Sequence, residues 1–97
     1  IPNLPKDACV EIPVFADKDG IHKTIVGELP AHLAILVSTT AQIENLVVRA
    51  AMAKSRADVY HAVMMDPLCS AVCSLQEIRN MCDLIFEKNT DYLGDYK

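Results

Sequence analysis

Two groups of residues in the sequence have types and spacings that could carry out chemistry. His61 follows Asp58 by three positions, so on a helix the carboxylate could orient the imidazole as a general base. Cys69 and Cys73 are one helical turn apart, and with His61 they could hold a metal ion. Each group also has an ordinary interpretation, a partly buried histidine near a helix-capping acid and reduced thiols in an apolar helix. We favour the ordinary interpretations, because the spacing lacks the paired short loops of structural zinc sites.

The other titratable residues are dispersed. His22 falls in a predicted hairpin and His32 in the first turn of a predicted long helix. The chain has no glycine-rich phosphate loop, no H-E-x-x-H motif and no G-x-S-x-G motif. The sequence therefore predicts no catalytic, cofactor-binding or metal-binding residue in this chain. The carboxylates are spread over different predicted elements and include Glu11, Asp17, Asp19 and Asp83. Asp17 and Asp19 suit a turn.

Size and composition indicate one small domain with an excess of apolar residues, and the residue patterns described below predict an α+β fold. The chain has 97 residues, of which 52% are hydrophobic and 23% charged. For a chain with such a modest core, this surplus predicts that part of the surface normally lies against something else. The net charge of −4 and the lack of a basic cluster argue against nucleic acid as a partner. No stretch has the continuous apolarity of a membrane span, and no signal peptide is visible at Ile1, so we expect part of a longer protein.

A β-hairpin is predicted over residues 9–26. Val10, Ile12 and Val14 alternate with residues of the opposite face. Pro13 cannot donate a ladder hydrogen bond, so this strand should lie at an edge or be bulged there. The turn is predicted at 17–20.

A mostly helical region follows, with helices predicted over 30–54, 56–65, 67–73 and 75–89. Pro30 suits the start of the first helix, and the β-branched run 37–40 should bend or interrupt it. Ser55, Asp66 and the Ser74–Glu77 capping box are the predicted starts of the other helices. The first helix is apolar around most of its circumference and needs cover from elsewhere. Its stripe consists of Leu33, Leu36, Val37, Ile43, Leu46, Val47 and Ala50.

Taken together, the sequence resembles the C-terminal part of glycoside hydrolase family 4, with the closest likeness to its α-galactosidase (melibiase) branch. The matching positions run in order through nearly the whole chain, which makes the resemblance specific. They are Asn3-Leu4-Pro5, Val10-Glu11, Asp17 with Gly20-Ile21, Val26-Gly27, Leu29-Pro30, Tyr60-His61-Ala62 and Met65-Asp66-Pro67.

The resemblance implies a two-domain enzyme of which this chain is the C-terminal part. Members of the family bind NAD in an N-terminal dinucleotide-binding domain and hold a divalent metal, usually manganese. They hydrolyse glycosides by oxidation, elimination, addition and reduction, an exception to two-carboxylate hydrolysis. Here the fold would resemble the C-terminal domain of lactate/malate-dehydrogenase-like proteins, and NAD and manganese would bind outside this chain. The parent would be a cytoplasmic homo-oligomer acting on α-galactosides or related sugars, and the 97 residues alone should be inactive.

One departure from the family pattern affects the expected specificity. Where the family often has T-N-x-N-x-Q, this chain has Thr40, Gln42 and Glu44 at the three amide positions. Two other functions remain open on sequence alone. One is a non-catalytic helical module for dimerisation or interaction, and the other is a metal-binding module that uses Cys69, Cys73 and His61.

Overall fold

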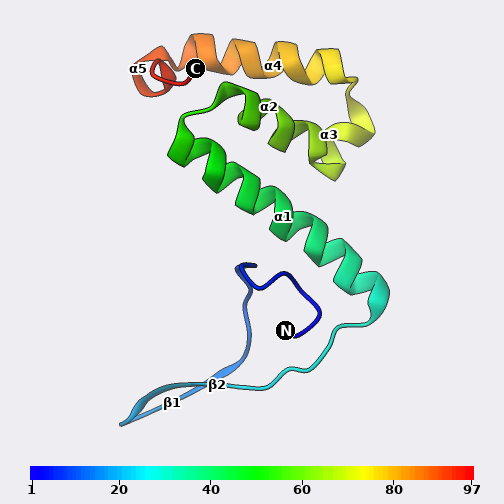
Figure 1. Ribbon diagram of the computed structural model, residues 1–97, viewed down its shortest axis with the longest axis vertical. Coiled ribbons are helices and arrows are strands. Elements are labelled where there is room, and N and C mark those ends of the chain that lie inside the picture. The colour runs from blue at the N-terminus through cyan, green and yellow to red at the C-terminus, as the bar shows by residue number, and fades with distance from the viewer. The chain divides into compact units, whose positions relative to one another are not determined.

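The structure, a computed structural model that describes all 97 residues, consists of a two-stranded hairpin followed by helices (Figure 1). This confirms the predicted α+β class. The elements are β1 (Val14–Asp17), β2 (Gly20–Lys23), α1 (Ala31–Ala53), α2 (Arg56–Met65), α3 (Pro67–Val72), α4 (Leu75–Lys88) and α5 (Thr90–Leu93).

The chain divides into two compact units, Ile1–Gln42 and Ile43–Lys97. The sequence predicted one small domain. The division falls inside α1, so the first unit contains the hairpin with the start of α1, and the second contains the end of α1 with the remaining helices.

The hairpin is shorter than predicted. The antiparallel register pairs Val14 with Lys23 and Asp17 with Gly20. The prediction of strands throughout 9–26 was wrong at both outer ends, where the chain is not paired as strand. Pro13 has no N–H to donate. Its carbonyl accepts the last hydrogen bond between the two arms of the hairpin, from the Thr24 amide at 3.3 Å.

Helix α1 runs without interruption through the β-branched segment, so the predicted restart was wrong. The Thr39 hydroxyl donates to the Ile35 carbonyl at 3.0 Å, which gives this side chain a partner inside the helix. At the C-terminal end Lys54 adopts a φ of 52°. The Ser55 amide donates to the Ala50 carbonyl at 3.0 Å and the Lys54 amide to the Ala51 carbonyl at 3.3 Å. This is a Schellman termination with lysine at the position that glycine usually takes.

Most apolar side chains of α1 are exposed, as the sequence predicted for a helix that needs cover from elsewhere. The helix is also long and apolar enough to cross a membrane by length and composition, which the sequence analysis did not expect. Thr40, Gln42 and Glu44 lie in the middle of α1, where polar and charged groups are costly in lipid. We therefore interpret the apolar surface of α1 as protein-facing.

The starts of α2, α3 and α4 are capped by the predicted residues. The Ser55 hydroxyl accepts from the Asp58 amide at 3.2 Å, and the Asp66 carboxylate accepts from the Cys69 amide at 2.7 Å. Ser74 and Glu77 form the complete capping box. The structure confirms all three predicted helix starts.

The core of the second unit lies between α2 and α4. Ile78 is the only large side chain that is completely buried. Tyr60, Cys82 and Phe86 complete the buried cluster, and the Tyr60 and Phe86 rings meet edge-on with centroids 6.1 Å apart. Ile85 on α4 is about half exposed.

Candidate functional site

The His61 imidazole is exposed on α2 and the Asp58 side chain is partly buried, and no hydrogen bond joins them. His61 Nδ1 is 3.9 Å from Asp58 Oδ1, which exceeds hydrogen-bonding distance. The same carboxylate oxygen lies 3.4 Å from a guanidinium nitrogen of Arg49. Asp58 therefore serves the start of α2, and the geometry does not give His61 the orienting partner that a general base requires.

The cysteines of α3 and α4 contribute to packing. Cys69 and Cys73 are partly buried against the core cluster and Cys82 is buried, whereas Cys9 is exposed. A hydrogen bond to the Asp66 carboxylate raises the pKa of the Cys69 thiol, and burial raises it further. Burial also raises the pKa of Cys82. These shifts favour the protonated thiol over the thiolate that binds metals.

No three His, Cys, Asp or Glu side chains gather so that they could hold a metal ion. The alternative ligand set of Cys69, Cys73 and His61, which the sequence analysis did not favour, therefore does not assemble. The exposed His61 ring instead borders the surface depression described below.

The predicted turn residues of the hairpin do stabilise the turn. Asp17 Oδ1 accepts from the Asp19 amide at 2.8 Å and lies 2.9 Å from His22 Nε2. The contact with His22, followed by the bond from the Asp19 amide, holds the pKa of Asp17 below its usual value. Gly20 follows with a φ of 126°, which side chains rarely tolerate. His22 thus stabilises the hairpin turn through its contact with Asp17. His32 is exposed near the start of α1.

A charged cluster on α2 and α4 was not predicted from sequence. The Tyr60 hydroxyl donates to Asp83 Oδ1 at 2.5 Å, and a guanidinium nitrogen of Arg56 lies 3.6 Å from the same oxygen. The Arg56 guanidinium also stacks 4.4 Å from the Phe86 centroid, and that of Arg79 lies 5.0 Å from the Tyr60 centroid. No local pattern indicates these pairs, because Tyr60 and Asp83 are 23 positions apart.

This cluster borders an open depression of about 510 Å³ but does not form a catalytic arrangement. The hydrogen bond to Asp83 raises the pKa of Tyr60, so the phenol stays protonated near neutral pH. Asp83 in turn balances the charge of Arg56. The cluster joins α2 to α4 and stabilises the core beneath it.

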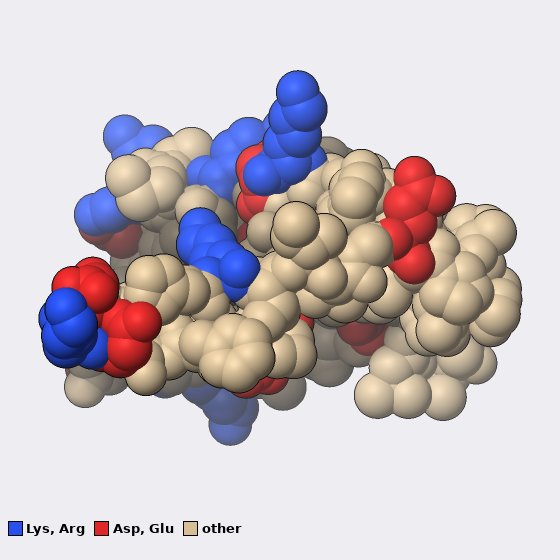
Figure 2. Space-filling model, turned by 90° about the horizontal axis from the view of Figure 1, so that it is seen from below, with Lys and Arg blue, Asp and Glu red and all other residues tan.

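The three positions that depart from the family pattern are exposed on α1. Thr40, Gln42 and Glu44 make no side-chain hydrogen bond within the chain. On the face of the molecule drawn in Figure 2, uncharged side chains cover most of the surface. The chain thus offers exposed apolar and uncharged surface but no assembled reactive group.

The comparisons with known proteins agree with the resemblance. Residues 1–69 match the model of the family 4 glycosyl hydrolase C-terminal domain. An α-galactosidase of Bacillus subtilis (strain 168) is 39% identical over 97 residues, which is 100% of this chain and 22% of that protein. An α-galactosidase of Rhizobium meliloti (strain 1021) is 31% identical over 96 residues, which is 99% of this chain and 20% of that protein.

No solved structure matches the chain. The chain spans about a fifth of the length of the curated relatives it matches, and both carry the α-galactosidase name expected from the resemblance. The family match covers more than half of the residues. This chain therefore belongs to glycosyl hydrolase family 4 and corresponds to the C-terminal domain of that family.

Proposed function

We propose that the full-length protein is a glycosidase that hydrolyses α-galactosides and that this chain is its C-terminal part. The observation that supports the proposal is the 39% identity with an α-galactosidase over every residue of the chain. As the sequence resemblance implies, the enzyme would use NAD and manganese and act by oxidation, elimination, addition and reduction. It would work in the cytoplasm as a homo-oligomer.

The residues of this chain do not fit either cofactor. No three potential metal ligands gather, and no glycine-rich loop precedes a helix to receive a pyrophosphate. We therefore derive no catalytic step from these residues and place both cofactor sites in the remaining part of the enzyme. The role proposed for this chain is to complete the fold through its exposed apolar surfaces.

Activity measurements on the full-length protein and on the 97-residue chain test this proposal. Both proteins are incubated with an aryl α-galactoside, with NAD and Mn²⁺ together and with each omitted in turn. We expect hydrolysis only by the full-length protein and only with both additions. Hydrolysis by the full-length protein without NAD would point to a two-carboxylate mechanism instead, and turnover by the isolated chain would contradict our placement of the reactive groups.

A second function, non-catalytic dimerisation, is favoured by one observation. Helix α1 exposes Ile35, Leu36, Val47, Val48 and Met52, and large exposed apolar patches often mark sites of protein–protein contact. If the full-length protein is inactive, sedimentation velocity tests whether it dimerises. A dimer that dissociates when Leu36 and Val47 are both replaced with Asp would support this second function. A monomer at all concentrations would exclude it.

A further inference from the structure

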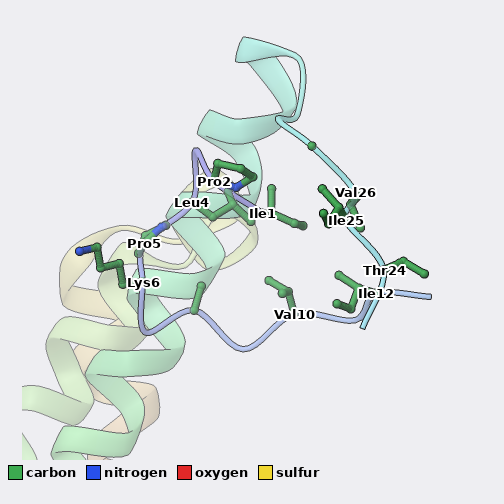
Figure 3. Close-up of a pocket in the computed structure, with 12 residues that line it drawn as sticks. Ile1, Pro2, Leu4, Pro5, Lys6, Val10, Ile12, Thr24, Ile25 and Val26 are labelled. Atoms are coloured by element: carbon green, nitrogen blue, oxygen red, sulfur yellow. The ribbon is translucent and has the colours of Figure 1, made fainter. Parts of the chain in front are cut away.

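The first unit contains an apolar cavity between the N-terminal segment and the segment that follows the hairpin (Figure 3). Its volume is about 490 Å³. Lys6 is the only charged residue that lines it. We call it the Ile25 pocket, after the side chain at its edge that is 98% exposed. Its other principal lining residues are Ile1, Leu4, Val10, Ile12 and Val26.

The walls of the Ile25 pocket are held in place by hydrogen bonds within the unit. Asn3 donates through Nδ2 to the Leu29 carbonyl at 2.8 Å and accepts through Oδ1 from the Leu29 amide at 3.0 Å. On the hairpin side the Thr24 hydroxyl donates to the Pro13 carbonyl at 2.6 Å. The two segments that flank the pocket are therefore fixed at both ends, and the pocket is formed before anything occupies it.

The backbone around the Ile25 pocket has free hydrogen-bonding groups. The amides of residues 9–12 and 25–28 make no backbone hydrogen bond, although these segments flank the two paired strands. A hairpin of two strands is at best marginally stable in water, and unpaired edges readily accept further strands. Branched apolar residues such as Val10, Ile12 and Ile25 have a high propensity for strands, which favours such strand addition.

The chemistry of the pocket indicates a protein segment as its occupant. A pocket for a sugar or a nucleotide carries placed polar side chains that fix its orientation, and Lys6 and Thr24 are the only polar side chains here. The matched relatives are about five times as long as this chain, which leaves most of an enzyme to cover its surface. Ile1 and Pro2 line the pocket, so residues that precede them in the enzyme enter beside it at high effective concentration.

We infer that the preceding domain of the enzyme docks on the first unit, pairs a strand with residues 9–12 or 25–28 and inserts an apolar side chain into the Ile25 pocket. This inference rests on the proposed function, in which this chain is the last part of a longer enzyme. It assigns the first unit to contact between the domains of one polypeptide, rather than to contact between subunits.

Hydrogen exchange on the full-length protein tests the strand pairing. Amides of residues 9–12 or 25–28 should exchange on the order of 100-fold more slowly than unstructured amides, because a paired strand must open before it exchanges. Unprotected exchange in both segments would overturn the inference. Protection that disappears when an oligomer is diluted to monomers would also overturn it, since a second copy would then cover the surface.

A matched pair of substitutions in the full-length protein tests the pocket. Ile25→Asp should lower the melting temperature by roughly 4 °C or more and raise exchange at 25–28 about tenfold, because a charge would enter an apolar contact. Leu68→Asp is the control, since Leu68 lies on α3 of the second unit and is 75% exposed. Equal melting temperatures for the two variants would overturn the inference.

These measurements are independent of the proposed activity. Protected amides in a protein that does not hydrolyse α-galactosides would refute the function and keep the docking surface. An active α-galactosidase with unprotected amides would refute only the docking surface.

Discussion

Replacing Ile78 with Ala should be the most damaging apolar truncation in the second unit. Ile78 is 0% exposed and lies at the centre of the core cluster between α2 and α4. The other members of that cluster, Tyr60, Cys82 and Phe86, each retain some exposure. No other large side chain in the chain is so completely enclosed, so the cavity left by truncation has the least opportunity to be filled by water.

The size of the effect follows from the atoms removed. Ile→Ala removes three carbons, which at about 0.8 kcal/mol per buried methylene amounts to roughly 2.4 kcal/mol before the cavity is counted. With the cavity, we expect a loss of about 3–4 kcal/mol in the free energy of unfolding. Ile85→Ala makes the same chemical change on the same helix, where the side chain is 48% exposed. Its loss should be near 1 kcal/mol, about half of the transfer value.

Urea unfolding, followed by circular dichroism, measures the free energy of unfolding of both variants and of the unsubstituted 97-residue chain. The Ile78→Ala midpoint should fall well below that of Ile85→Ala, and the melting temperatures should differ by roughly 10 °C for a domain of this size. A variant that is already unfolded without urea agrees with the larger loss. Equal losses for the two variants would refute the account of the core, because burial would then not decide the cost.

Two polar contacts give further predictions. Ser74→Ala should cost about 1 kcal/mol of stability by removing the capping box, whereas Ser70→Ala, which removes an exposed hydroxyl bond within α3, should cost less than about half of that. The Ser74 amide, and after it the Ser74 hydroxyl, donates to the Glu77 carboxylate and lowers its pKa, so this carboxylate stabilises the fold above pH 4.5 and loses that contribution as the pH falls. Urea unfolding from neutral to acidic pH should show a smaller loss of stability in Ser74→Ala, which removes the hydroxyl and keeps the amide. The hydrogen bond to Asp83 raises the pKa of Tyr60, so the stability that this bond contributes is present below pH 10.0 and disappears as the pH rises through the folded pKa. Ultraviolet difference titration should show Tyr60 ionising at lower pH in Asp83→Asn. An unchanged titration would exclude the bond.

Local signals in the sequence predicted the helix starts well. Ser55, Asp66 and Ser74 each cap the helix they were expected to cap, because a side-chain oxygen satisfies an amide only two or three residues away. The turn at Asp17–Gly20 followed from the same local chemistry. The end of α1 was less predictable, since Lys54 takes a positive φ without a glycine to indicate it.

Features that depend on distant partners were not available from the sequence. The bond between Tyr60 and Asp83 joins two helices, and no local sequence pattern in either helix indicates it. The strands predicted over 9–26 have the right residue types, but strand pairing requires a neighbour, and the chain supplies one only for Val14–Asp17 and Gly20–Lys23. The sequence has no local motif that would indicate where the reactive groups of the family lie.

We propose that this chain is part of an NAD- and manganese-dependent glycosidase whose cofactor sites lie elsewhere in the polypeptide. Native mass spectrometry measures this directly on the full-length protein and on the 97-residue chain, each mixed with NAD and Mn²⁺. We predict that the full-length protein carries both per subunit and that the 97-residue chain carries neither. Stoichiometric NAD or Mn²⁺ on the 97-residue chain, or neither on the full-length protein, would contradict the account.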